Sequence, residues 1–284
     1  MNVEKMIEFP DLISLSGSKL YGTHLSESDD DYIGFILPPP EILFSLENFN
    51  QYSSDINGCD KTIYSLKEFF KLLLNGQTRP IEILFSNNYL ATKLGYRVLE
   101  NRNLFISKKY YRVIKGFSHS EFLKGKGLGK EISFRDKEEK DLIEELCGKF
   151  KLKSYQRDSL CNILYEAIEF NPIVVKKIVE NLGDKRKENI EKFGYSPKNM
   201  SHAIRLLYQG IELLSSCRMT FPRPEADDLL QIKRGECSLE HIDETYNRLS
   251  RELDHIYDIS TLQKIPDFNR INMLYTSILK DRFL

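Results

Sequence analysis

A short acidic run near the N-terminus has the residue types and the spacing that bind a divalent metal ion. The run Asp29-Asp30-Asp31 stands directly before an apolar stretch at residues 32–37. Because side chains alternate between the two faces of a strand, we expect Asp29 and Asp31 on one face and Asp30 on the other. Two carboxylates on one face repel each other unless a cation lies between them. Such oxygen ligands suit Mg²⁺ or Mn²⁺, which complete their coordination with water and substrate phosphates.

A Gly-Ser turn precedes the acidic run. Gly17 and Ser18 follow an apolar run at residues 12–15, and they are expected to connect a strand to a helix. Backbone N–H groups at such a helix start can hold phosphate groups, and Lys19 either adds positive charge there or points to solvent. A Gly-Ser dipeptide alone is usually a turn, and a bare Asp-x-Asp is most often solvated. Both motifs in this order and spacing are much more specific.

The two motifs together resemble the Gly-Ser and Asp-x-Asp signature of the DNA-polymerase-beta-like nucleotidyltransferase superfamily. The forms GSKLYGT, at residues 17–23, and SDDDYIGF, at residues 28–35, are most similar to the branch associated with bacterial and phage RNA repair. The resemblance implies transfer of a nucleoside monophosphate from an NTP, such as ATP, to an acceptor hydroxyl. It implies that Asp29 and Asp31 are catalytic ligands of Mg²⁺ or Mn²⁺, and that residues 17–19 bind the nucleotide.

The resemblance also implies a third carboxylate on a neighbouring strand, and Glu82 is the predicted one. Glu82 interrupts the apolar run 81–85, which is expected to form a strand. A buried lone acid is costly unless it is paired or holds a cation, although an edge-strand Glu can simply face water. The matching positions of the branch are Tyr64, Leu66, Phe69, Gly76, Glu82, Leu84 and Phe85. Glu82 is therefore predicted to be the third catalytic and metal-binding acid.

The second half of the chain contains candidate phosphate ligands on one expected helix. Lys198, His202 and Arg205 match the GY-x-x-K-x-x-x-HA-x-R-L-L element of the same branch, and a further match covers residues 223–236. His202 and Arg205 are three residues apart and so share a helix face. Arg binds phosphate bidentately, so these residues are predicted to line the substrate cleft and bind the nucleotide. The alternative is that Arg205 pairs with a neighbour on its own helix.

The elements that position these residues predict an α+β protein. Residues 1–122 are expected to form a nucleotidyltransferase core, a small mixed sheet flanked by helices, in which Ser65 and Glu68 form a capping box. Residues 123–135 are expected to be a basic Gly/Lys loop, because the sequence KGKGLGK lacks the glycine spacing of a phosphate-binding loop. Residues 136–284 are expected to form a helical domain, including a helix over 173–182, with the substrate cleft between core and helices.

Composition limits the classes of partner and the compartment. Among 284 residues, 41 are Lys or Arg and 42 are Asp or Glu, so the formal net charge is −1 and RNA contacts need a local basic patch. The five cysteines form no Cys-x-x-Cys pair, which argues against a zinc site and a disulfide framework. No apolar run approaches ~20 residues, so a cytoplasmic protein without a membrane partner is expected.

The expected partners are an NTP substrate and an RNA end as acceptor. The sequence does not predict an oligomeric state. Two other functions remain open. One is a protein-modifying, AMP-transferring nucleotidyltransferase, which uses the same Gly-Ser and Asp-x-Asp core, and the other is a non-catalytic nucleotide-binding module.

Overall fold

A computed structural model describes residues 6–46, 49–56, 59–132, 137–153, 156–157, 160–161, 173–177 and 184–283. The chain divides into two compact units, one of Met1–His119 with Met200–Leu284 and one of Ser120–Asn199. The expected boundaries near residues 122 and 135 differ from this division. The reason is that Met200–Leu284 interacts with the N-terminal part of the chain. One such interaction is the ion pair between Arg205 and Glu82, at 3.0 Å.

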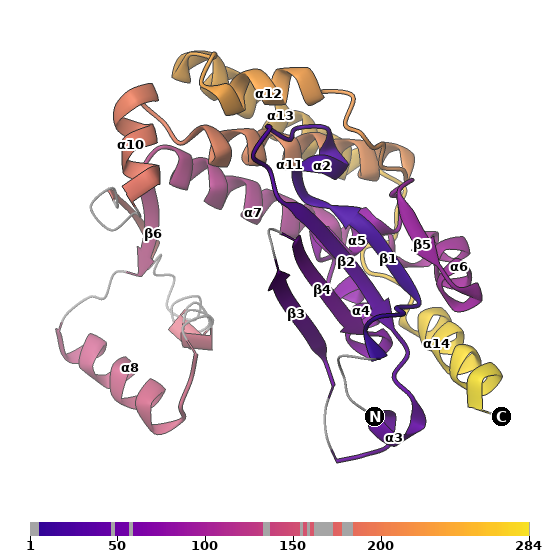
Figure 1. Cartoon of the computed structure of the whole chain (residues 1–284). Coiled ribbons are helices and arrows are strands. Elements are labelled where there is room, and N and C mark those ends of the chain that lie inside the picture. The colour runs from indigo at the N-terminus through magenta and orange to yellow at the C-terminus, as the bar shows by residue number, and fades with distance from the viewer. Residues whose placement is uncertain are drawn as a thin grey trace. The chain divides into compact units, whose positions relative to one another are not determined.

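The first unit is built on a five-stranded mixed sheet, with strand order β3-β4-β2-β1-β5 (Figure 1). The strands are β1 (Leu12–Ser16), β2 (Asp30–Ile36), β3 (Gln51–Ile56), β4 (Cys59–Ser65) and β5 (Tyr89–Ala91). Strands β2 and β4 are parallel, and the other neighbouring pairs are antiparallel. The mixed sheet and the α+β class predicted from the sequence are confirmed.

Both faces of the sheet are covered by apolar side chains. On one face, α4 (Leu66–Leu74) and α5 (Thr78–Ile83) pack on the central strands, and the rings of Phe35 and Phe69 lie 4.7 Å apart. On the other face, Ile36 and Ile63 form a cluster with Met6 and Ile7 from the N-terminal segment. The predicted cap of α4 is present, because the Ser65 hydroxyl accepts a hydrogen bond from the Glu68 backbone N–H at 3.1 Å.

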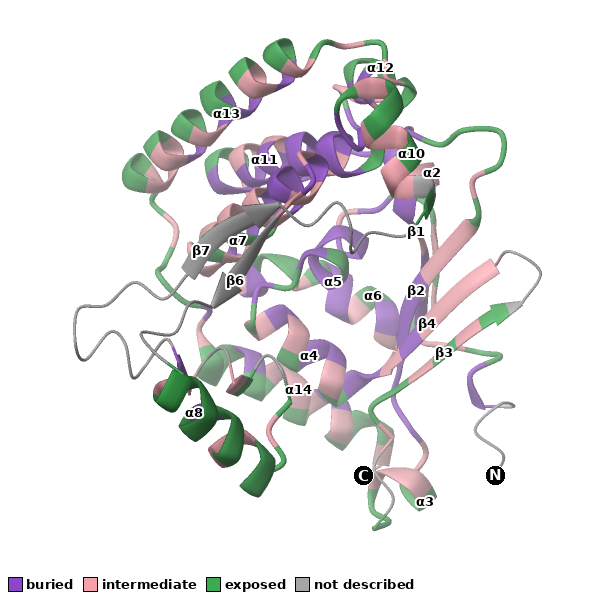
Figure 2. Cartoon of the chain, turned by 90° about the vertical axis from the view of Figure 1, so that its left-hand side faces the viewer, coloured by how far each residue is buried: buried purple, intermediate pink, exposed green. Residues whose placement is uncertain are grey.

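Further helices complete the first unit. They are α2 (Gly17–Tyr21), α3 (Pro40–Leu43), α6 (Lys93–Glu100), η1 (Arg102–Phe105), most of α7 (Lys109–Gly125) and of α11 (Pro197–Ser216), α12 (Ala226–Arg234), α13 (Leu239–Ile259) and α14 (Phe268–Phe283). Figure 2 shows α11 buried along most of its length and α13 exposed along one side. The helical C-terminal region predicted from the sequence is therefore present.

The second unit contains a two-stranded antiparallel sheet that the sequence did not predict. Its described elements are β6 (Leu128–Ile132), α8 (Lys137–Lys149), β7 (Ile173–Lys177) and α10 (Asp184–Phe193), and Leu128 pairs with Lys177. Residues 123–125 belong to α7 and residues 128–132 form β6, so the predicted basic loop over 123–135 is wrong there, and residues 133–135 lie outside the described residues. The predicted helix over 173–182 is wrong at β7, where β-branched residues favour a strand. Of the expected helical domain over 136–284, residues 136, 154–155, 158–159, 162–172, 178–183 and 284 lie outside the described residues.

No helix within the ranges that the structure describes is both long enough and apolar enough to cross a membrane.

Two glycines test how tightly the sheet is packed. A Cβ on Gly34, in β2, would overlap the carbonyl oxygen of Leu12 and lie 3.1 Å from Cα of Ile13. A Cβ on Gly116, in α7, would meet no atom of the described residues within 4 Å apart from the nearby backbone of its own helix. We expect Gly34→Ala to lower the free energy of unfolding by ~1–3 kcal/mol through overpacking. Gly116→Ala should raise it by ~0.5–1 kcal/mol, because alanine favours a helix interior. Urea unfolding measures the free energy of unfolding of both variants. The same change in Gly34→Ala as in Gly116→Ala would contradict the close approach of β1 and β2.

Candidate active site

The Gly-Ser turn and the second aspartate of the acidic motif lie against each other. Strand β1 ends at Ser16, which pairs with Asp31 in β2. Helix α2 then begins at Gly17, which has a positive φ of 63°. A Cβ on Gly17 would lie 2.7 Å from Cγ of Asp31 and overlap its Oδ2. Only glycine therefore leaves room for this carboxylate beside the turn. The structure brings together two motifs that the sequence analysis had connected only through their order.

A row of carboxylates crosses three neighbouring strands at this end of the sheet. Asp31 in β2 is paired in register with Asp60 in β4, and Asp60 is paired with Asp55 in β3. Residues directly opposite each other in neighbouring strands project from the same face. Asp31 and Asp60 are half-buried and Asp55 is exposed. This face therefore concentrates negative charge next to Gly17.

Asp60 is not predicted from the sequence, because the Asn, Ser, Asp and Gly residues of the stretch 48–60 are typical of a loop or hairpin. Its signal was the position of Asp60 two residues before Thr62, at the start of a short β-branched run. Asp31 stands in the same way two residues before Ile33. A hairpin that returns β4 parallel to β2 then places the two acids side by side.

The other two acids of the motif have different surroundings. Asp29 is exposed and directly precedes β2, so the strand alternation places it on the side of Asp31. Asp30 belongs to the opposite face, where its Oδ1 accepts a hydrogen bond from Nζ of Lys19 at 2.6 Å. This bond raises the pKa of Lys19. Lys19, predicted as a nucleotide ligand, is thus engaged with Asp30.

The chemistry of the acids near Gly17 determines which cation they would fit. Within the described parts of the chain, no group of three or more His, Cys, Asp or Glu side chains is arranged to hold a metal ion. Asp31 and Asp60 offer only oxygen atoms. Mg²⁺ is usually bound by one or two carboxylates together with water and substrate phosphates. The residues present therefore fit a site that closes around a metal–nucleotide complex.

Glu82 does not have the surroundings predicted for the third metal ligand. It lies in helix α5 and not in a strand, and its side chain is only 1% exposed. Oε1 accepts a hydrogen bond from Nη1 of Arg205 at 3.0 Å, and Oε2 accepts one from the hydroxyl of Tyr21 at 2.7 Å. Because both carboxylate oxygens are bonded inside the protein, we remove Glu82 from the candidate metal site. Its apolar neighbours had fitted a buried helix as well as a strand.

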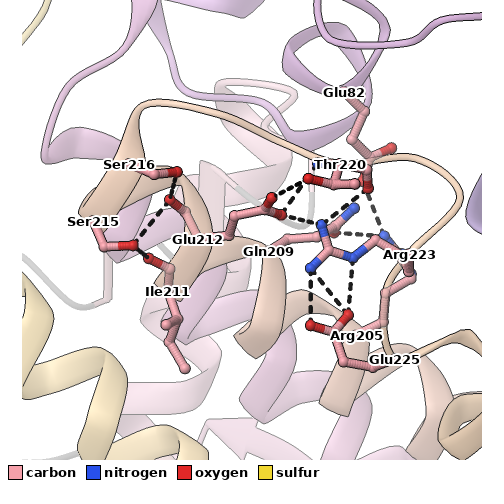
Figure 3. A network of polar contacts seen from close by, with 10 residues as sticks. All are labelled: Glu82, Arg205, Gln209, Ile211, Glu212, Ser215, Ser216, Thr220, Arg223 and Glu225. Carbon is pink, nitrogen blue, oxygen red and sulfur yellow. Dashed lines mark hydrogen bonds and ion pairs between the residues drawn. The ribbon is translucent and has the colours of Figure 1, made fainter.

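Arg205 likewise points into the protein and not toward a phosphate site. Its side chain is 7% exposed, and Nη1 also donates to Oε1 of Gln209 at 2.6 Å (Figure 3). Its guanidinium lies over the ring of Tyr21, 3.8 Å from the centroid. Desolvation lowers the pKa of Arg205, but the interactions with Tyr21 and Glu82 outweigh it and leave this pKa raised. The alternative of a surface pairing with a neighbour on the same helix is met only by the hydrogen bond to Gln209, because the ion-pair partner is Glu82 of α5 and the Arg205 side chain is buried.

Three other predicted nucleotide ligands differ from Arg205 in their surroundings. The His202 ring is half-buried and meets the ring of Phe117 edge-on, with centroids 5.1 Å apart. Lys198, near the start of α11, is exposed. Ser18, in the turn itself, is half-buried.

The stretch that follows α11 holds the end of α2. Arg223 has a buried side chain that forms ion pairs with Glu212 and Glu225 (Figure 3), and its backbone N–H donates to the carbonyl of Tyr21 at 3.0 Å. Thr220 and Arg223 lower the pKa of Glu212, even though its partial burial acts in the opposite direction. The resemblance at residues 223–236 implies no role for this stretch, and the structure shows that it holds the end of α2.

No protein-family model, no curated protein and no solved structure matches the chain. A functional assignment therefore depends on the geometry of the residues described above.

The buried ion pair gives a test that separates a structural acid from a metal ligand. Removing either partner leaves a buried charge unpaired, so Glu82→Met or Arg205→Met should each lower the free energy of unfolding by ~3–5 kcal/mol. The double variant Glu82→Met/Arg205→Met should recover most of that loss, because it removes both charges. Thermal and urea unfolding without metal measure these effects.

The exposed pair of Arg248 and Glu252, at 3.7 Å, is the matched control. Arg248→Met should change the free energy of unfolding by no more than ~1 kcal/mol. A Glu82→Met protein with unchanged stability would contradict the structural role of this acid.

Proposed function

We propose that the protein is a metal-dependent nucleotidyltransferase that moves a nucleoside monophosphate from an NTP to an acceptor hydroxyl. The observation that carries the proposal is the position of Asp31, whose carboxylate occupies the space beside Gly17 that a side chain would fill. A phosphate-binding turn and a metal-binding acid are thereby next to each other. Asp60, opposite Asp31 in the neighbouring strand, adds the second carboxylate in place of Glu82.

In the proposed reaction, the acceptor oxygen bonds to the α-phosphorus of the NTP, and the bond from that phosphorus to the bridging oxygen breaks. Pyrophosphate leaves with the bonding electron pair, and a carboxylate of the row takes the proton of the hydroxyl. Asp31 and Asp60, with Asp29 at the entry to β2, would hold Mg²⁺ or Mn²⁺. When bound, the metal supplies stabilisation of the charge that develops on the phosphoryl oxygens. The backbone at Gly17 and Ser18 orients the terminal phosphates.

An RNA end is the proposed acceptor, on the resemblance of the Gly-Ser and Asp-x-Asp stretches. The same chemistry also allows a protein side chain or a small molecule as the acceptor. The net charge of −1 provides no long-range attraction to RNA, so acceptor binding depends on local cations.

Incubation with each α-labelled NTP in turn, with Mg²⁺ or Mn²⁺ and with either RNA or total protein from a lysate, tests the reaction and identifies the acceptor. We expect label on RNA and release of unlabelled pyrophosphate, and no label when the metal is chelated. Label on protein would identify the other acceptor. Absence of label on every acceptor would contradict the proposed activity.

The two paired acids should be needed for transfer but not for folding. Asp31→Asn and Asp60→Asn should each lower kcat by at least about 100-fold, because each removes a ligand whose metal contributes several kcal/mol to the transition state. Thermal stability without metal should hold or rise, because each substitution relieves repulsion between like charges.

Asp30→Asn is the control within the same motif, because Asp30 faces away from the row and pairs with Lys19. We expect its kcat to stay within a few-fold of the wild-type value. An inactive Asp30→Asn protein beside an active Asp31→Asn protein would show that the assigned strand faces are wrong.

A further inference from the structure

We propose that Glu82 and Arg205 are positioning residues, which act through Tyr21 to fix the Gly17–Ser18 turn for phosphate binding. This inference rests on the proposed function, and it gives the buried pair a role beyond stability. The contact between the pair and the turn is made by one side chain, because Tyr21 ends the helix that Gly17 begins.

Tyr21 is held on two sides by the buried pair. Its hydroxyl donates a hydrogen bond of 2.7 Å to Oε2 of Glu82, and its ring lies under the guanidinium of Arg205 at 3.8 Å. The residue is only 7% exposed. Burial is the largest of the effects that raise the pKa of Tyr21, so the hydroxyl keeps its proton and remains a donor. A shift of the tyrosine would leave a buried carboxylate oxygen without its partner, which is costly.

Helix α2 needs such support because it is short. It has five residues, fewer than a helix needs to be stable without tertiary contacts. Its first residue, Gly17, is placed against Asp31, and its last, Tyr21, is placed against Glu82 and Arg205. Both ends of the helix are therefore determined by residues from other elements.

Glu82 and Arg205 are themselves held in place by the elements to which they belong. Glu82 belongs to α5, which packs on β1 and β2, and Arg205 belongs to the 20-residue helix α11. Gln209, one turn further along α11, accepts a hydrogen bond from Arg205 at 2.6 Å and is itself fully buried. The pair thus connects the sheet, a long buried helix and the turn.

The backbone after Tyr21 is held at a second place. Its carbonyl accepts a hydrogen bond from the N–H of Arg223 at 3.0 Å. At Gly22, which has a positive φ of 74°, an added Cβ would lie 2.9 Å from Cβ of Pro222. The side-chain bond of Tyr21 and this backbone bond are independent, so removing the hydroxyl alone should loosen the turn without unfolding the unit.

Tyr21→Phe tests the proposal, and Tyr110→Phe is its matched control. Tyr110 is also a buried tyrosine and is within electrostatic range of Glu82 and Arg205, but its hydroxyl has no hydrogen-bond partner among the residues that the structure describes. Both substitutions delete one buried hydroxyl and keep the ring. Only the first removes a bond to the carboxylate.

Two measurements on the full chain are compared. Hydrogen exchange followed by mass spectrometry reports on residues 17–23, where the Gly22 and Thr23 N–H groups donate to the carbonyls of Lys19 and Ser18. Steady-state transfer reports KM for the metal–NTP complex and kcat separately. For Tyr21→Phe we expect about 10-fold faster exchange in this segment and about a 10-fold higher KM, as for loss of a hydrogen bond to a charged group, with kcat nearly unchanged. For Tyr110→Phe we expect neither change.

Failure of the inference and failure of the proposed function give different results. If the wild-type protein transfers no nucleotide to any acceptor, the proposed function is wrong, and hydrogen exchange alone then decides whether Tyr21 fixes the turn. Unchanged exchange in Tyr21→Phe, or equal acceleration in Tyr110→Phe, would overturn the positioning role. With an active wild-type protein, faster exchange at an unchanged KM would also overturn it, because the turn would then not limit phosphate binding.

Discussion

The contact between Gly17 and Asp31 is the constraint on which the candidate site depends. Pairing of Ser16 with Asp31 brings the start of β2 to the end of β1, and the chain then turns with a positive φ at Gly17. A side chain at this position would collide with the carboxylate. The absence of a side chain therefore allows the turn and the carboxylate of Asp31 to lie together. The proposed metal–phosphate complex would make this arrangement favourable, because Mg²⁺ is usually bound by carboxylates together with substrate phosphates.

Acidic residues of the first unit have different surroundings, and we propose a structural role for one of them and metal binding for the others. Asp31 and Asp60 are half-buried on one face of the sheet, in a row whose like charges repel. Glu82 is fully buried, and Arg205 and Tyr21 satisfy both of its oxygens. Glu82 is therefore a structural acid, whereas Asp31 and Asp60 are the acids that we propose to bind a cation.

Local features of the sequence predicted much of the fold. Strand alternation around the acidic motif, the Ser65 cap and the helices after residue 197 depend on neighbouring residues, and all are present. The partners of Glu82 could not be predicted, because Arg205 is 123 residues away and periodicity does not report such pairs. Asp60 was missed because only the strand register places it opposite Asp31. The β6–β7 pair was missed for the same reason, since each strand is short and gains its partner from a distant segment.

Binding of Mn²⁺, followed by electron paramagnetic resonance with and without an NTP, tests the central claim most directly. The account predicts weak binding of Mn²⁺ alone, because two paired carboxylates form an incomplete site, and binding at least about 10-fold tighter when the NTP is present. In the double variant Asp31→Asn/Asp60→Asn, the NTP should no longer increase the affinity for Mn²⁺. Equal affinity for Mn²⁺–NTP in the wild-type protein and in this variant would contradict the claim that the row of acids beside Gly17 forms the metal–nucleotide site.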